Sequence, residues 1–112
     1  MPRVVGDTME SIEIDVNTQY EISKWGIKEP IKSLDNEEVK TFDICITPLL
    51  YADIKGNRVG YGKGFYDRFF IENNVERKIG INYFGTNELI SDCCKSDIKL
   101  DFLITPHHVI EF

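Results

Sequence analysis

The sequence is poor in cysteine, and it has no long apolar run. Its three cysteines, Cys45, Cys93 and Cys94, show neither the CxxC spacing of a zinc site nor the even count of a disulfide framework. That usage is typical of a reducing compartment, so we expect a cytoplasmic protein. No stretch of this chain approaches the roughly 20 apolar residues of a membrane-spanning helix. The first residues, MPRVVGDTMESIEIDV, also lack the charged and then apolar layout of a signal peptide.

The sequence also lacks an excess of positive charge. Thirteen Lys and Arg stand against 19 Asp and Glu, and 13 − 19 gives a formal net charge of −6. A general nucleic-acid or anionic-membrane binder would carry a basic stripe, so we expect neither partner. With 42% hydrophobic and 29% charged residues in 112 positions, residues 1–112 are expected to form a single folded domain.

Hydrophobic patterning predicts an α/β chain. A period of two predicts strands, short apolar runs predict buried strands, and aromatic residues at positions i, i+4 and i+5 predict a helix. The expected strands are 9–16, 42–47, 78–84, 101–105 and an edge strand at 109–112; the expected helix is 65–73, and 17–40 is expected to be mostly surface loop. This order indicates a mostly parallel central sheet with flanking helices and a glycine-rich phosphate loop leading into a helix.

The richest segment for chemistry is DIKGNRVGYGKGFYDRF, residues 53–69, where four of the eight glycines fall within nine positions. A glycine-rich turn before a helix leaves backbone N–H groups facing outward, and these favour a phosphate. Lys63 could neutralise phosphate charge. Arg58 and Arg68 could each bind two phosphate oxygens through a bidentate contact. Asp67 lies in the first turn of the expected helix, where a carboxylate would tolerate phosphate if Mg²⁺ lay between them.

Explanations that involve no ligand also remain open for the same residues. The segment is not a Walker A loop, and a bare GxGxG motif is often a turn that binds nothing. The three cations could form a solvated face, and we expect Phe69 and Phe70 to be core residues. The density of glycines, cations, aromatics and a carboxylate in about a dozen positions favours a functional site.

The run GNRVGYGKGFYDR, residues 56–68, closely resembles the signature of the 5-formyltetrahydrofolate cyclo-ligase (5,10-methenyltetrahydrofolate synthetase) family. The resemblance extends over nearly all of the chain. It includes, in the family order, PRVVGDTMESIEI, WGIKEP, FDICITPLLYADIKGNRVG, KIGINYF and SDIKLDFLIT.

This resemblance implies an ATP- and Mg²⁺-dependent ligase that converts 5-formyltetrahydrofolate into 5,10-methenyltetrahydrofolate and releases ADP and phosphate. It implies catalytic roles for Lys63 and Arg58, and Mg²⁺ binding by Asp67 and Asp97. The implied ATP-binding residues are Arg58, Val59, Gly60, Tyr61, Gly62, Lys63, Gly64, Phe65, Tyr66 and Arg68. The implied folate-binding residues are Tyr61, Gly62, Lys63, Gly64 and Phe65. Trp25 falls on the folate side in the family, although packing is an equal explanation for a lone Trp.

Two departures from the family pattern shape the expectations. Family members usually begin with a basic helix, a strand and a further helix, so we expect residues 1–112 to be incomplete relative to the family. Ser96 stands where the family has a His beside the second metal-binding Asp. An N-terminal complementing segment or self-association is therefore an expected partner besides ATP and the folate. The alternative is a truncated, non-catalytic nucleotide- or phosphate-binding domain that needs a partner segment.

Overall fold

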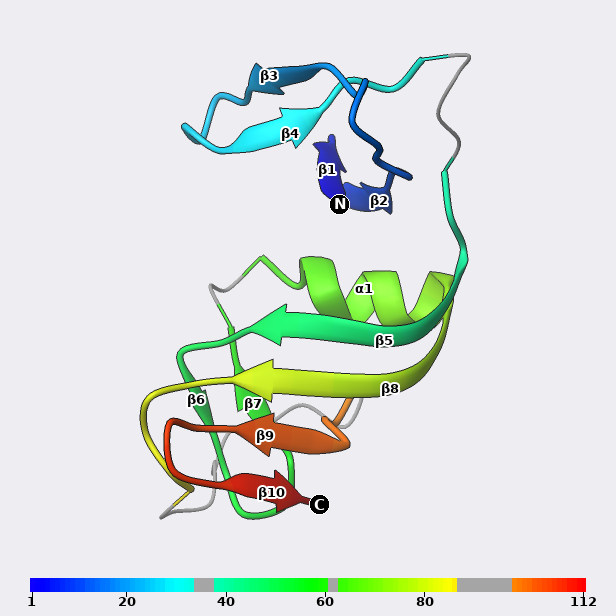
Figure 1. Ribbon diagram of the computed structural model, residues 1–112. Coiled ribbons are helices and arrows are strands. Elements are labelled where there is room, and N and C mark those ends of the chain that lie inside the picture. Colours follow the sequence, from blue (N-terminus) through cyan, green and yellow to red (C-terminus); the bar gives the residue numbers. More distant parts are fainter. Residues whose placement is uncertain (34–37, 61–62, 87–97) are drawn as a thin grey trace. The chain divides into compact units, whose positions relative to one another are not determined.

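The computed structural model describes residues 1–33, 38–60, 63–86 and 98–112. The chain divides into two compact units, residues 1–40 and 41–112, and each is described by itself. Figure 1 shows the elements of both units. The expectation that residues 1–112 form a single domain stays a prediction.

The first unit consists of two antiparallel hairpins. Strands β1 (Pro2–Val5) and β2 (Thr8–Ser11) form one hairpin, and β3 (Tyr20–Ile22) and β4 (Lys28–Pro30) form the other. The predicted strand 9–16 is therefore wrong beyond Ser11, and the loop predicted for 17–40 contains two strands. Of the alternating isoleucines, Ile12 is fully buried, whereas Ile14 and nearby Val16 are exposed. The alternation thus stops at Ile12.

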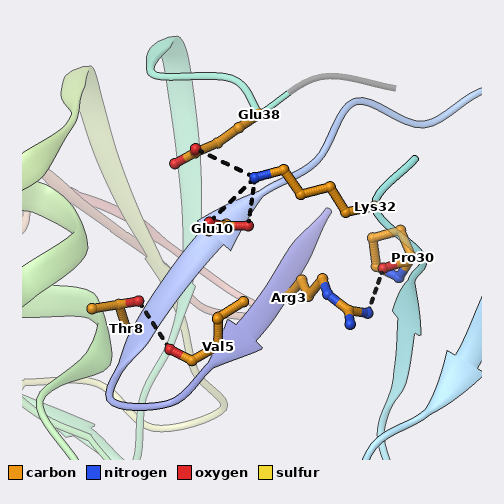
Figure 2. Close-up of polar contacts among 7 residues, drawn as sticks. All are labelled: Arg3, Val5, Thr8, Glu10, Pro30, Lys32 and Glu38. Carbon is orange, nitrogen blue, oxygen red and sulfur yellow. Dashed lines mark hydrogen bonds and ion pairs between the residues drawn. The ribbon is translucent and has the colours of Figure 1, made fainter. Parts of the chain in front are cut away.

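Polar side chains connect the hairpins of this unit (Figure 2). The Arg3 guanidinium donates to the Pro30 carbonyl at 3.0 Å and to Glu21 Oε1 at 2.6 Å. Lys32 lies 3.3 Å from a carboxylate oxygen of Glu10 and 3.9 Å from one of Glu38. These contacts link β1 to β4, and β2 to the chain on either side of residues 34–37.

The second unit is built on a four-stranded sheet of order β10-β9-β8-β5 (Figure 1). Strand β5 is Thr41–Pro48, β8 is Asn74–Ile81, β9 is Phe102–Ile104 and β10 is Val109–Glu111. Strands β5, β8 and β9 are parallel to one another, and β10 pairs with β9 in the antiparallel direction. The predicted α/β class with a mostly parallel sheet is confirmed, although the described residues contain only one helix, α1 (Phe65–Glu72).

The predicted element bounds in this unit fit α1, β5, β9 and β10 closely. The helix ends as expected at Asn73, whose amide N–H and side-chain Nδ2 both donate to the Phe69 carbonyl, at 3.0 and 2.8 Å. Strand β8 instead begins four residues before the predicted 78, and it ends at Ile81. Three of these four residues are polar, and the segment is a strand because β5 pairs with it, which a pattern of side chains cannot reveal.

The core of the second unit lies on one face of the sheet. Its buried members are Leu49, Ala52, Leu100 and Leu103, with Ile110 and Phe112 packed against them. Gly80 lies beneath this core: a Cβ there would be 2.4 Å from Leu49 Cδ2 and 2.7 Å from Leu100 Cδ1. Only glycine lets the sheet approach the two leucines so closely.

On the opposite face of this sheet, part of β5 is exposed. Side chains alternate along a strand, and Ile44 and Ile46, which share one face of β5, are 51% and 61% exposed. The expectation of a buried strand at 42–47 is therefore wrong for this part of the strand. In the part of the chain that the structure describes, no helix has the length and apolar character that crossing a bilayer requires.

Candidate functional site

A small hairpin leads into the glycine-rich segment. Strands β6 (Tyr51–Ala52) and β7 (Arg58–Val59) pair in the antiparallel direction. Between them the buried carboxylate of Asp53 accepts the N–H of Lys55 at 2.8 Å, the N–H of Asn57 at 3.0 Å and Nδ2 of Asn57 at 2.9 Å. Asp53 thus fixes the turn from which Arg58 and the glycines extend.

The glycine-rich segment ends at the N-terminus of α1. Gly64 is the N-cap residue, with φ of 68°, a left-handed conformation that glycine adopts without strain. No side chain caps this helix end among the described residues. Lys63 is exposed, and its carbonyl accepts a hydrogen bond of 2.7 Å from Nη2 of Arg68. An exposed cation thus directly precedes the N-terminus of a helix whose N-cap residue makes no side-chain capping hydrogen bond, a combination that suits an anion.

Arg58 and Asp67 form an ion pair beside this helix end. Nη2 of Arg58 lies 2.5 Å from Oδ1 of Asp67, and the Arg58 side chain is only 6% exposed. The guanidinium also lies 5.5 Å above the ring of Phe70. Oδ1 of Asp67 accepts a second hydrogen bond, from the N–H of Ile98 at 3.1 Å. One carboxylate oxygen therefore joins β7, α1 and the segment before β9.

Aromatic side chains of α1 form the packed side of the helix. Phe69 and Phe70 are buried, as predicted, and their ring centroids are 6.0 Å apart. Phe42 of β5 packs on Phe69, and Tyr66 packs on Phe70. Phe65 lies 5.3 Å from the Arg68 guanidinium. The core explanation therefore holds for Phe69 and Phe70, whereas Phe65 and Tyr66 are only partly buried.

The structure brings together most of the residues that the sequence singled out. Arg58 and Val59 in β7, Gly60 after it, and the run 63–68 all lie within the hairpin and helix just described. Tyr61, Gly62 and Asp97 lie outside the described residues, as do Cys93 and Cys94. Trp25 belongs to the first unit, at the tip of the β3–β4 hairpin, and is 51% exposed, so it is not a core residue.

Sequence reasoning missed three contributors to the site. Asp53 organises the turn, Phe70 lies under Arg58, and the Ile98 N–H binds Asp67. The DxxxN spacing of Asp53 and Asn57 around Gly56 was a usable turn signal. The other two depend on tertiary contacts that no local pattern encodes.

Among the described residues, Asp67 could serve magnesium as one carboxylate ligand. Among the described residues no group of three or more His, Cys, Asp or Glu side chains could hold a metal ion. Oδ1 of Asp67 accepts two hydrogen bonds from described residues. Because Mg²⁺ often takes one or two carboxylates plus phosphate oxygens, this arrangement is compatible with a nucleotide-bound ion.

Cys45 is the described cysteine near this site, and burial raises the pKa of its thiol above the ordinary value of 9.0. A hydrogen bond with the Thr47 side chain and the charges of Arg58 and Lys78 act in the opposite direction. Burial is the largest of these effects, so the thiol stays protonated near neutral pH. The residue therefore acts as a small packed side chain rather than as a nucleophile.

Comparison with known proteins places the chain in a family. The family model of the 5-formyltetrahydrofolate cyclo-ligase family matches residues 1–105. A probable 5-formyltetrahydrofolate cyclo-ligase of Schizosaccharomyces pombe is 30% identical, over 98% of this chain and 62% of the relative. The 5-formyltetrahydrofolate cyclo-ligase of Mycoplasma pneumoniae is also 30% identical, over 92% of this chain and 52% of the relative.

A solved structure agrees with the sequence matches. The NMR structure of Aquifex aeolicus 5,10-methenyltetrahydrofolate synthetase superposes with a TM-score of 0.80 at 28% identity, over 98% of this chain and 56% of that one. The chain thus spans between about half and two thirds of these three relatives. By its sequence over residues 1–105 and by its fold, the chain belongs to the 5-formyltetrahydrofolate cyclo-ligase family.

Proposed function

We propose that this protein uses ATP to convert 5-formyltetrahydrofolate into 5,10-methenyltetrahydrofolate, with release of ADP and phosphate. One observation carries the proposal. In a chain of this family, the exposed Lys63 directly precedes Gly64, the N-cap residue of α1, which makes no side-chain capping hydrogen bond. A cation beside the N-terminus of a helix is suited to the γ-phosphate of ATP.

The chemistry explains why ATP is needed. The formyl oxygen on N5 is a poor leaving group, and transfer of the γ-phosphoryl group to that oxygen, with departure of ADP, makes it a good one. The N10 amine then attacks the formyl carbon, N10 loses its proton, and the C–O bond breaks to release phosphate. The new C–N10 bond closes the ring.

The residues of the chain would act by positioning and charge stabilisation, as in other phosphoryl transfers. Lys63 would neutralise charge on the transferring phosphoryl group, and the N–H groups at the start of α1 would hold its oxygens. Phe65 and Tyr66 would border the nucleotide side, with Tyr61 and Gly62 between the two substrates. Mg²⁺, held by Asp67 and Asp97, would offset phosphate charge. We also propose a cytoplasmic location for this reaction.

Turnover tests the proposal. The chain is mixed with 5-formyltetrahydrofolate, ATP and Mg²⁺, and the absorbance of the methenyl product is followed. We expect product formation that falls by about 100-fold or more in Lys63→Ala, because a charge at the reacting phosphate is lost. Lys55→Ala, which alters an exposed lysine in the turn before β7, is the matched control and should leave the rate unchanged.

Two results would contradict the proposal. Equal rates in the Lys63→Ala and Lys55→Ala variants would remove Lys63 from the mechanism. ADP binding by a folded chain that forms no product would instead favour the alternative, a nucleotide-binding domain that depends on a complementing segment or on self-association.

A further inference from the structure

The burial of Arg58 conflicts with a simple role as a phosphate ligand. Its side chain is 6% exposed, and Nη2 is committed to Asp67 at 2.5 Å. The guanidinium carbon lies 5.5 Å from the centre of the Phe70 ring. Among the described residues Nε has no hydrogen-bond partner, so the group is held by its charge and by one strong bond. Lys63 and Arg68, by contrast, are at least partly exposed.

Asp67, the partner of Arg58, contacts more than one element. Asp67 lies in the first turn of α1, and its Oδ1 also accepts the Ile98 N–H. Arg58 lies in β7, five residues before Lys63 in the sequence, and Asp67 lies four residues after it. The ion pair therefore ties together the two elements on either side of Lys63 and Gly64. Burial strengthens such a pair, because nearby water does not screen it.

We propose that Arg58 is a positioning residue that acts through Asp67: their buried ion pair holds the first turn of α1 against β7 and so sets where Lys63 meets a nucleotide phosphate. The inference rests on the proposed function, since it assumes that ATP is bound at this helix end. It differs from a direct contact between Arg58 and phosphate, because the guanidinium would keep Asp67 as its partner while ATP is bound.

ATP binding in the presence of EDTA separates the two roles. EDTA removes any metal that Asp67 could hold, so only the contribution of the carboxylate itself remains. If Arg58 touched phosphate, Asp67→Asn would free the guanidinium, remove a negative charge and tighten ATP binding. If Arg58 acts through Asp67, the same change loosens the helix end and weakens binding. Asparagine keeps an oxygen for the Ile98 N–H, so the variant tests mainly the charge.

We expect Arg58→Met and Asp67→Asn each to raise the Kd for ATP in EDTA by about tenfold, the middle of the range for coupled neighbours. The double variant should also be weaker by about tenfold rather than a hundredfold, because both changes break one interaction. The matched controls are Arg77→Met and Asp43→Asn, which alter exposed charges of β8 and β5. They should leave the Kd unchanged.

Tighter or unchanged ATP binding by Asp67→Asn would overturn the inference, as would multiplicative losses in the double variant. If Arg58→Met does not fold, Arg58→Lys replaces it: lysine keeps the charge but not the planar donor pair. Weaker binding by Arg58→Lys would support positioning, whereas full affinity would overturn it.

Hydrogen exchange gives a second readout that does not depend on ATP. The inference predicts faster exchange of the amides of residues 63–68 and of Ile98 in Arg58→Met than in Arg77→Met, and unchanged exchange would overturn it. If the unaltered chain bound no ATP, the proposed function would fail, and this exchange comparison would decide the positioning role by itself.

Discussion

At the scale of single residues, the second unit depends on polar side chains that are buried or partly buried. Asp53 and Asp67 are acidic residues that the chain uses as acceptors for backbone N–H groups. Cys45, paired in register with Lys78, is kept neutral by burial despite nearby positive charge. The sequence identified Asp67, Lys63 and Arg58 by type and spacing. It could not identify the ion pair, because that contact forms only when β7 and α1 fold together.

The raised pKa of Cys45 predicts a pH dependence of stability. When a group's pKa is higher in the folded state than in the unfolded one, its contribution is complete below the unfolded value, here 9.0. That contribution is lost as the pH rises through the folded value. The unaltered chain should therefore lose stability relative to Cys45→Ala on going from about pH 7.5 to about pH 9.5.

Urea unfolding of both proteins at the two pH values measures this loss, and Cys93 and Cys94 are common to both. A difference in unfolding free energy that is the same at both pH values would show that burial does not control the Cys45 thiol.

At the scale of elements, local pattern predicted best where a segment is apolar or aromatic. The apolar runs gave β5 and β9, and the phenylalanine spacing gave α1. The β3–β4 hairpin escaped prediction because its strands are three residues long and largely polar. Its turn is held by backbone bonds, including Gly26 N–H to the Ser23 carbonyl at 2.9 Å, and these leave little trace in hydrophobicity.

Close packing between β8 and the core gives a prediction for Gly80. A methyl group there would collide with Leu49 and Leu100, so Gly80→Ala should lower the unfolding free energy by about 1–3 kcal/mol, as expected for overpacking. Gly85→Ala is the matched control, because no atom lies within 4 Å of its added Cβ. Thermal or urea unfolding compares the two. Equal unfolding free energies would mean that Leu49 and Leu100 move to accommodate the methyl group without a loss of stability.

At the scale of the whole molecule, the sheet of the second unit has two unlike faces. One face carries the core around Leu103, and the other exposes Ile44 and Ile46. Parallel sheets usually bury both faces, which is why the sequence favoured a fully buried β5. Burial depends on the covering layer rather than on the strand itself, so the apolar run alone could not predict it. The described contacts of the candidate site all lie within residues 41–112.

The measurement that tests the central claim most directly is an NMR titration of the ¹⁵N-labelled chain with ADP and Mg²⁺. The account predicts shifts for the amides of residues 58–68 and Ile98, and none for the amides of the β3–β4 hairpin. Lys63→Ala should reduce those shifts at the same ADP concentration. Unshifted amides over residues 58–68 at millimolar ADP, in a chain with dispersed folded signals, would contradict a nucleotide site at the start of α1.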